Sequence, residues 1–313
     1  MMKHADAFLQ FLTAEQRLSP NTLAAYRNDL RQFEEYLDQR SQGPFGDGEG
    51  DAATATREAV AGFFLSLRED KGYSSATIAR KMAAVKALFH FLVKQGSVTA
   101  SPVADLGAPE VKKPLPRSIT VDEVDRLMRQ TDIKSSPEGL RDRAMLHLLY
   151  ATGMRVTELV SLDIEDLDVD ANKVRCVGRG ARIRYLPIDA RTVAAVRDYL
   201  DRGRPLLLRP GFPQTALYLN HRGQRLTRQG FWLIMKGVAR DSGVSSEVTP
   251  HTLRHSFAAH RLSDGLALPR LRELLGHANI STTQVYAQIK NGGARTLVAG
   301  TRRLAVVGGA ARH

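Results

Sequence analysis

The sequence contains a single cysteine, Cys176, among 313 residues, so it cannot form an intrachain disulfide. No apolar run approaches the roughly 18 residues that a membrane-spanning helix requires. The N-terminal segment has an aspartate inside its apolar stretch and lacks a small-residue cleavage site, so we interpret it as mature protein. These absences favour a protein of the reducing cytoplasm over a secreted or membrane protein.

Acidic residues are in the minority only in the second part of the chain. Residues 1–108 hold 12 Lys+Arg against 13 Asp+Glu, whereas residues 109–313 hold 33 against 20. The formal net charge of +12 therefore lies almost wholly in the second part. Such a basic region is typical of proteins that bind nucleic acid, although a solvated basic surface would have the same composition.

Acidic residues are also missing between Lys71 and Lys94, a segment with five basic residues beside an apolar helical face. Because the first part of the chain is otherwise nearly neutral, this local stripe stands out. A contact with DNA phosphates and a simple solvated face both fit the pattern. We predict DNA contacts at Arg80, Lys81 and Lys86.

A proline-rich segment, residues 107–120, carries three prolines and no helical period, and it is the best candidate for a domain boundary. The length of the chain also favours two domains over one. We predict an N-terminal helical domain over residues 1–107, a linker over 108–118, and a second domain over 119–313.

Apolar residues that recur every three or four positions predict a mainly α fold. Ser19 and Pro20 mark one helix start, Ser74 and Ser75 mark another, and glycine-rich residues 41–56 read as a loop. The predicted helices cover residues 5–18, 20–37, 57–70, 76–92, 121–130, 138–151, 155–161, 190–202, 228–241, 250–264, 269–275 and 281–290. Short strands are predicted at 166–169, 173–178 and 182–188, the last two forming a hairpin.

Three segments concentrate reactive or cationic side chains: "ATGMRVTEL" (151–159), "PHTLRHSFAAH" (250–260) and "LGHANISTTQVYAQI" (275–289). Taken singly, each has an ordinary explanation. Arg155 could form a salt bridge with Glu158 three residues later, His277 could cap a helix, and Tyr286 could be a half-buried core residue.

His251 and His255 are four residues apart on one helix, which is also the spacing of a zinc-binding pair. However, Arg254 would place a cation at that site, and the glutamate base of zinc hydrolases is missing. The sequence therefore predicts no metal site.

Taken together, two arginines, two histidines and one tyrosine, without a carboxylate pair, suit the attack of a tyrosine on a phosphodiester. Arginine forks bind the non-bridging phosphate oxygens and stay charged at any working pH. Nearby cations should lower the pKa of the tyrosine, about 10 when unperturbed, and a histidine can accept its proton. The phosphotyrosyl product would store the bond energy, so that strands rejoin without a nucleotide cofactor.

These three segments closely resemble the signature motifs of the tyrosine recombinases of the phage integrase superfamily, and in particular its Xer-type members. "LSPNTLAAYRNDLRQF" (18–33) is similar to the N-terminal DNA-binding helices of that family, so the resemblance covers nearly the whole chain. The resemblance implies a helical, SAM-like core-binding domain and an α-rich catalytic domain with a small β-hairpin. Together they would close around duplex DNA as a clamp.

The resemblance also implies roles for five residues. Arg155 corresponds to the first catalytic arginine, His251 and Arg254 to the central pair, His277 to the second histidine, and Tyr286 to the nucleophile. Four protomers would exchange strands in two steps through a Holliday junction, either alone or with a second recombinase and a DNA translocase, and would need no cofactor. Chromosome dimer resolution is the expected role, and a mobile-element integrase or a DNA-binding protein with weakened catalysis are the alternatives.

The family places a catalytic lysine in a "GKG" turn of the hairpin, where this chain has Arg179 in "GRG". An arginine is a poor acid but a good hydrogen-bond donor. Three explanations fit: Arg179 replaces the lysine with reduced proton transfer, Lys173 reaches in, or the enzyme is weakened. We favour the first. The C-terminal tail, which docks on a neighbouring protomer in the family, is expected either to dock here or to fray.

Overall fold

The computed structural model describes residues 3–15, 18, 20–42, 51–111, 117–209, 211, 214–245, 247–277, 283 and 286, apart from the side chains of Lys3 and Arg179. The chain divides into two compact units, Met1–Lys113 and Pro114–His313. Both are mainly helical, and one small sheet lies in the second unit, which confirms the predicted fold class. None of the described helices is both long and apolar enough to cross a bilayer.

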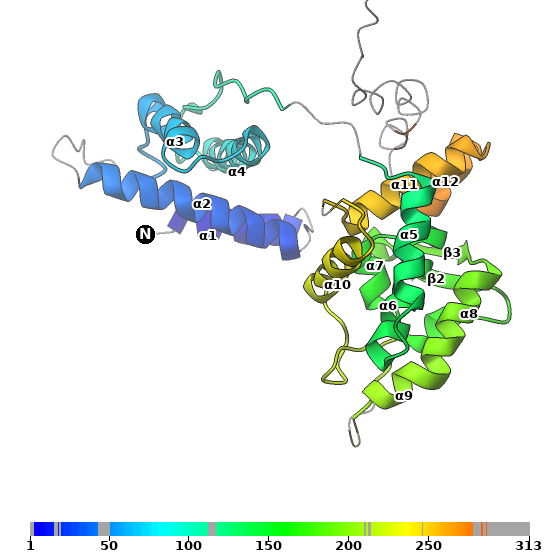
Figure 1. Ribbon diagram of the computed structural model, residues 1–313. Helices are drawn as coiled ribbons and strands as arrows, with labels where there is room; N and C mark the ends of the chain where they lie inside the picture. The colour runs from blue at the N-terminus through cyan, green and yellow to red at the C-terminus, as the bar shows by residue number, and fades with distance from the viewer. Residues whose placement is uncertain are drawn as a thin grey trace, which may run out of the picture. The chain divides into compact units, whose positions relative to one another are not determined.

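The described residues of the N-terminal unit form four helices: α1 (Lys3–Glu15), α2 (Pro20–Ser41), α3 (Arg57–Glu69) and α4 (Ser75–Lys94) (Figure 1). Thr56 and Ser74 cap α3 and α4, since each side chain accepts a hydrogen bond from a backbone N–H three residues later. Helices α2 and α4 pack against each other, with Leu30, Phe33 and Phe89 fully buried.

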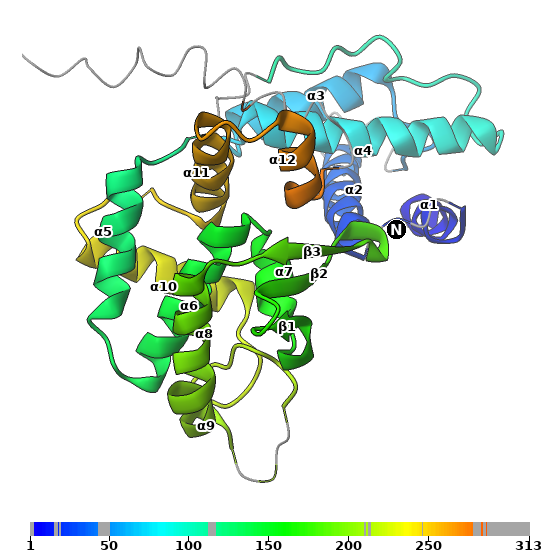
Figure 2. The ribbon, with the colours of Figure 1, turned by 90° about the vertical axis from the view of Figure 1, so that its right-hand side faces the viewer.

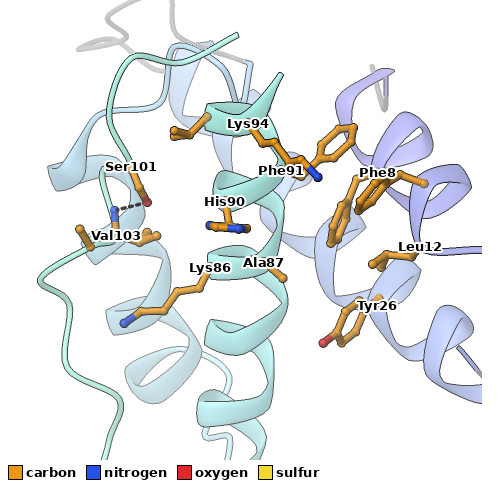
Figure 3. A pocket seen from close by; sticks show the side chains of 13 residues that line it. Phe8, Leu12, Tyr26, Lys86, Ala87, His90, Phe91, Lys94, Ser101 and Val103 are labelled. Carbon is orange, nitrogen blue, oxygen red and sulfur yellow. Dashed lines mark hydrogen bonds between the residues drawn. The ribbon is translucent and has the colours of Figure 1, made fainter. Parts of the chain in front are cut away.

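A cavity of about 640 Å³ lies beside α4 in this unit (Figure 3). Phe8 and Leu12 of α1 and Tyr26 of α2 line one side of it, and Ser101 and Val103 line the other. Its walls are aromatic and aliphatic, with basic groups from α4. None of the predicted catalytic residues lines this cavity, because all of them belong to the C-terminal unit.

The C-terminal unit is organised around α6 (Pro137–Thr152), whose apolar residues point in all directions, as expected for a central helix. It packs against α5 (Val121–Asp132), α8 (Ala190–Asp198) and α11 (Pro250–Ser263), an arrangement that Figures 1 and 2 show. The other helices are α7 (Val156–Ser161), α9 (Arg204–Leu207), α10 (Arg228–Asp241) and α12 (Leu268–Leu275), with a 3₁₀ turn η1 (Ile164–Asp166).

The sheet of this unit has three antiparallel strands in the order β1 (Leu167–Asp168), β2 (Lys173–Val177) and β3 (Ile183–Pro187). The register pairs Val174 with Leu186 and Cys176 with Arg184. Val174, Cys176 and Leu186 turn to the core, so Arg184 enters the interior on the same face. The predicted hairpin is therefore present, and its turn is the 3₁₀ segment η2 (Arg179–Ala181).

The structure differs from the predicted helices mainly after α8. The expected helix over 190–202 ends at Asp198, and a π turn, η3 (Tyr199–Gly203), leads into α9. Pro205 has no N–H to donate, which interrupts the regular hydrogen-bond ladder at this point. Ser19, residues 43–50 of the predicted loop, and the rest of the predicted helix 281–290 and the tail lie outside the described residues.

Candidate active site

Gly153 ends α6 and determines where Arg155 lies. Its backbone is left-handed, with φ 60°, a conformation that glycine adopts at little cost. A Cβ atom at this position would also overlap the ring of Phe257 on α11. The missing side chain therefore lets the turn after α6 approach α11, and two residues later Arg155 stands at the N-cap of α7.

We expect Gly153→Ala to lower the free energy of unfolding of the C-terminal unit by about 2–4 kcal/mol. The left-handed backbone contributes about 1 kcal/mol of strain, and overpacking against Phe257 contributes about 1–3 kcal/mol. Urea unfolding followed by the fluorescence of Trp232, the only tryptophan of the chain, measures this unit directly.

Gly265→Ala is the matched control, because Gly265 also has a positive φ, 90°, but a Cβ there would meet no heavy atom within 4 Å. It should show the strain alone, about 1 kcal/mol. Equal losses in the two variants would contradict the close packing of Gly153 on Phe257.

Glu158 holds Arg155 in place from within α7. The Arg155 backbone N–H donates to Glu158 Oε2 at 2.7 Å, and Arg155 Nη1 donates to Oε1 at 3.0 Å. Burial alone would raise the pKa of Glu158, but hydrogen bonds from Arg184 and from the Arg155 backbone outweigh it and lower the pKa to about 2. The carboxylate is thus ionised throughout the working pH range and orients the Arg155 side chain, which is about one-third exposed.

Arg254 lies in the interior on α11, with 4% of its surface exposed. Its Nη1 donates to Gly153 O at 2.6 Å, and its Nη2 donates to Leu275 O at 2.7 Å and to His277 Nε2 at 3.0 Å. Burial, together with the charge of Arg155, lowers its pKa to about 10, so the guanidinium is still charged at neutral pH. One side chain therefore ties the ends of α6 and α12 to α11.

His277 follows Gly276, which ends α12 with a left-handed φ of 63°. A guanidinium can only donate, so Nε2 of His277 accepts from Arg254 and its proton resides on Nδ1. That Nδ1 lies 2.9 Å from Thr283 Oγ1, to which it donates. Burial and the neighbouring arginine charges lower the pKa of His277 to about 4, so the ring is neutral at neutral pH.

Tyr286 is 3% exposed, and its ring is nearly parallel to that of His277, with centroids 6.4 Å apart and an interplanar angle of 10°. Its hydroxyl lies 2.6 Å from Nδ1 of His255. Burial raises the pKa of Tyr286 and outweighs the opposing effect of Arg254 and Arg155. The nearby cations therefore act in the expected direction, but burial has the larger effect, so the net pKa of Tyr286 is raised and it is a phenol at neutral pH.

The histidine beside the tyrosine is His255. In the sequence it stands out only because its spacing from His251 is that of a zinc-binding pair. Burial, together with the charges of His251 and Arg254, lowers its pKa to about 4, so it is neutral and can accept a proton. His251, the predicted catalytic histidine, is exposed one turn earlier on α11. Helical spacing puts both on one side of α11, but only the fold of the chain after α12 decides which one meets Tyr286.

Arg179 lies in the turn of the β2–β3 hairpin, where the Gly178 N–H donates to Arg182 O at 2.8 Å. Its side chain lies outside the described residues, so its predicted role stays a prediction. Lys173, the other candidate, lies at the opposite end of β2, with Nζ 3.3 Å from Asp168 Oδ2. The length of the strand therefore separates Lys173 from the turn.

The three predicted DNA contacts of the N-terminal unit differ in their exposure. Lys81 is 2% exposed, and its Nζ donates to Asp29 Oδ1 and to Gln32 Oε1, both at 2.9 Å. Its ammonium is thus turned into the unit and is not available to a phosphate in this arrangement. Arg80 also pairs with Asp29 but is 46% exposed, and Lys86 donates to Leu106 O at 2.6 Å.

These contacts bring together one cluster, formed by Arg155, Arg254, His255, His277 and Tyr286. It offers cations, neutral imidazoles and a phenol. Burial raises the pKa of Cys176 to about 12, so it stays a thiol at neutral pH and is not a nucleophile. Within the described ranges, no group of three or more His, Cys, Asp and Glu side chains is placed to hold a metal ion. The arrangement suits binding of a phosphate anion next to an oxygen nucleophile.

Comparison with known protein families gives two matches that together span most of the chain. Residues 117–292 match the Phage integrase family, and residues 5–96 match the Phage integrase, N-terminal SAM-like domain. The first match includes every member of the cluster described above.

Curated relatives are similar along nearly their whole length. The chain is 47% identical over 291 residues to "Tyrosine recombinase XerC" of Herpetosiphon aurantiacus, covering 93% of this chain and 92% of the relative. It is 42% identical over 284 residues to "Tyrosine recombinase XerD" of Listeria monocytogenes, covering 91% and 93%.

Solved structures share the fold. The XerH site-specific recombinase bound to its difH substrate matches with a TM-score of 0.71 and 21% identity, covering 88% of this chain and 79% of that one. A lambda integrase dimer bound to a core site matches with a TM-score of 0.69 and 18% identity, covering 91% and 94%.

Proposed function

The chain belongs to the phage integrase family of tyrosine recombinases, and from this membership we propose that it breaks and rejoins DNA at a specific site with Tyr286 as its nucleophile. The observation that carries the proposal is the convergence of Arg155, Arg254, His277 and Tyr286. They come from separate segments of the chain, yet hydrogen bonds and ring stacking join them into one cluster.

The proposed reaction is a transesterification that neither consumes nor releases a cofactor. Tyr286 Oη attacks the scissile phosphorus, an O–P bond forms, and the bond from phosphorus to the 5′ oxygen breaks. The tyrosine gives up its proton and the 5′ oxygen takes one up. The products are a 3′-phosphotyrosyl link and a free 5′ hydroxyl, and attack by the 5′ hydroxyl of another strand reverses the chemistry.

The arginines are suited to the charge that develops on the phosphate. A guanidinium has five N–H donors, and three hydrogen bonds from Arg254 to described residues leave two for a phosphate oxygen. Arg155 is about one-third exposed, so it can reach a substrate while Glu158 orients it. Preorganised donors of this kind supply most of the catalysis of phosphoryl transfer.

The tyrosine proton has an acceptor within reach. His255 is neutral at neutral pH, and its Nδ1 lies 2.6 Å from the hydroxyl, the distance of a strong hydrogen bond. The charges of Arg254 and Arg155 act against the rise in the pKa of Tyr286, and they favour the phenolate that forms during attack. His251 is exposed on the same helix, and we propose it as a further phosphate contact.

Formation of a covalent adduct tests the proposal. A duplex library with randomised sequence is first enriched for the sites that the protein binds, and the enriched site is then rebuilt with a nick beside the scissile phosphate, which traps the intermediate. We expect a protein–DNA adduct that survives denaturation, with the nucleotide attached to Tyr286 in peptide mapping. Binding without any adduct on that site would instead favour a DNA-binding protein of this fold.

In the cell we propose resolution of chromosome dimers in the cytoplasm, by analogy with the XerC and XerD recombinases that the chain resembles. Four protomers, either identical or shared with a second recombinase, would assemble on duplex DNA and exchange strands through a Holliday junction. The N-terminal helices would close the clamp, with Arg80 and Lys86 as phosphate contacts.

We propose that Arg179 assists the departing 5′ oxygen, in the position of the family lysine. Arg179→Ala is expected to slow cleavage by roughly 10²-fold, the contribution of a general acid, whereas Arg179→Lys should preserve or raise the rate. The measurement is single-turnover adduct formation on the nicked duplex.

A bridging 5′ sulfur at the scissile phosphate provides the control, because a thiolate leaves without protonation. This substrate should restore the rate of Arg179→Ala. An Arg179→Ala variant that cleaves ordinary DNA at the wild-type rate would remove Arg179 from the mechanism.

A further inference from the structure

The end of α12 is held in an unusual way. Its last turn leaves backbone carbonyls without partners in the helix, as every helix end does. Each of three successive carbonyls accepts a hydrogen bond from a different arginine: Arg184 Nε at 2.9 Å from Leu274 O, Arg254 Nη2 at 2.7 Å from Leu275 O, and Arg155 Nη2 at 3.2 Å from Gly276 O. The negative end of the helix dipole favours such cations, and His277 follows at once.

Two of these arginines, Arg155 and Arg254, already have proposed catalytic roles. Arg184, the third arginine, has had no role so far. It comes from β3, the strand that leads away from the hairpin turn. Its fork faces Glu158, with Nη1 3.1 Å from Oε1 and Nη2 2.7 Å from Oε2. The same two oxygens accept the hydrogen bonds from Arg155, so one carboxylate joins both arginines.

The guanidinium of Arg184 is closely enclosed. Its side chain is 14% exposed. A Cβ atom at Gly276 would lie 3.0–3.3 Å from its Nη1, Cζ and Nε, and a Cβ at Gly178 would lie 3.1 Å from Nη1. The two glycines thus form the walls of a slot that a flat guanidinium fills. Gly178 directly precedes Arg179, so the slot lies at the base of the hairpin turn.

We propose that Arg184 is a positioning residue for strand cleavage: it ties the β2–β3 hairpin to Glu158 and to the last turn of α12, and so holds Arg155 and His277 in register for the scissile phosphate. This inference rests on the proposed function. Arg184 itself need not touch DNA, because all three of its donor nitrogens already serve Glu158 and Leu274.

The role requires an arginine. A lysine has one ammonium group on a flexible stem and cannot satisfy both carboxylate oxygens and the Leu274 carbonyl in fixed directions. We therefore expect Arg184→Gln to slow single-turnover adduct formation at saturating DNA by on the order of 10²-fold, the effect of a misplaced reacting group. Arg184→Lys keeps the charge and much of the volume, and it should still lose about tenfold.

Affinity for DNA separates positioning from binding. For both variants the dissociation constant for the intact site should stay within about threefold of wild type, because the defect lies in the geometry of the reaction. Arg204→Gln is the matched control. Arg204 is also a buried arginine bonded to backbone carbonyls, those of Gln214, Ala216 and Leu217, but it lies outside the cluster. It should cleave within about threefold of wild type.

A double-mutant cycle with Glu158→Gln tests whether Arg184 acts through Glu158. If the two form one unit, the double variant should lose about as much as the slower single variant, roughly 10²-fold, and not the product of both losses, roughly 10⁴-fold. Each of three results would overturn the proposal. The rate losses of the two single variants could multiply in the double variant, or both Arg184 variants could cleave within about threefold of wild type. The third result is a loss of cleavage in Arg204→Gln equal to that in Arg184→Gln.

The result with wild-type protein distinguishes a failure of the proposed function from a failure of the positioning role. If wild type forms no adduct on its enriched site, the proposed function fails. If wild type forms the adduct and the Arg184 variants do so equally fast, only the positioning role fails.

Discussion

Tyr286→Phe should abolish the covalent protein–DNA adduct, lowering its rate of formation by more than about 10⁴-fold, because no other group can take the place of the nucleophile. The substitution removes one oxygen and preserves the ring that stacks on His277. It leaves His255 Nδ1 without its partner, at a stability cost of about 1 kcal/mol, so the variant should fold and bind its site. Denaturing gels of the nicked duplex, together with a binding titration, measure both quantities.

Tyr150→Phe is the matched control for this result. Tyr150 in α6 also forms a tyrosine–histidine hydrogen bond, with its hydroxyl 2.8 Å from Nδ1 of His260. The change therefore removes the same kind of bond in the same unit, and cleavage should stay within about threefold of wild type. An adduct formed by Tyr286→Phe at a comparable rate would show that another residue attacks the phosphate.

The second large effect is expected for Arg254→Lys, which should slow adduct formation by roughly 10³-fold. The guanidinium serves Gly153 O, Leu275 O and His277 Nε2 at once, and a lysine ammonium cannot reach all three positions with the required directions. The variant keeps the positive charge, so the loss measures geometry and phosphate coordination and not net charge.

Arg141→Lys provides the comparison. Arg141 is 5% exposed on α6 and donates to Leu219 O at 2.8 Å, so it is a similarly buried arginine away from the cluster. Both variants should lose stability, whereas only Arg254→Lys should lose cleavage at saturating DNA. Cleavage by Arg254→Lys at the rate of Arg141→Lys would contradict a catalytic role for Arg254.

Local features of the fold were predictable. The described helix starts agree closely with the predicted ones because caps and apolar periods act within a few residues, as at Pro20, Ser74 and Thr249. The π turn after α8 was not predicted, since it depends on how Tyr199 and Gly203 pack as well as on Pro205.

The candidate site was also predictable only in part. The motifs around Arg155, Arg254 and Tyr286 are strong enough to identify the family and to predict the chemistry. The role of Glu158 was visible only as an ordinary salt bridge three residues from Arg155. Its second partner, Arg184, is 26 residues away on β3, and only the tertiary structure brings its side chain to Glu158.

The sequence by itself therefore determined the family, the helical architecture and the candidate groups Arg155, Arg254, His277 and Tyr286. The tertiary structure alone decided that His255 meets the tyrosine, that burial raises the pKa of Tyr286, and that Asp29 holds Lys81 inside the N-terminal unit. The physical reason is the same in each case. Hydrogen bonding and desolvation depend on partners 31 to 52 residues apart in the chain, which local patterns do not encode.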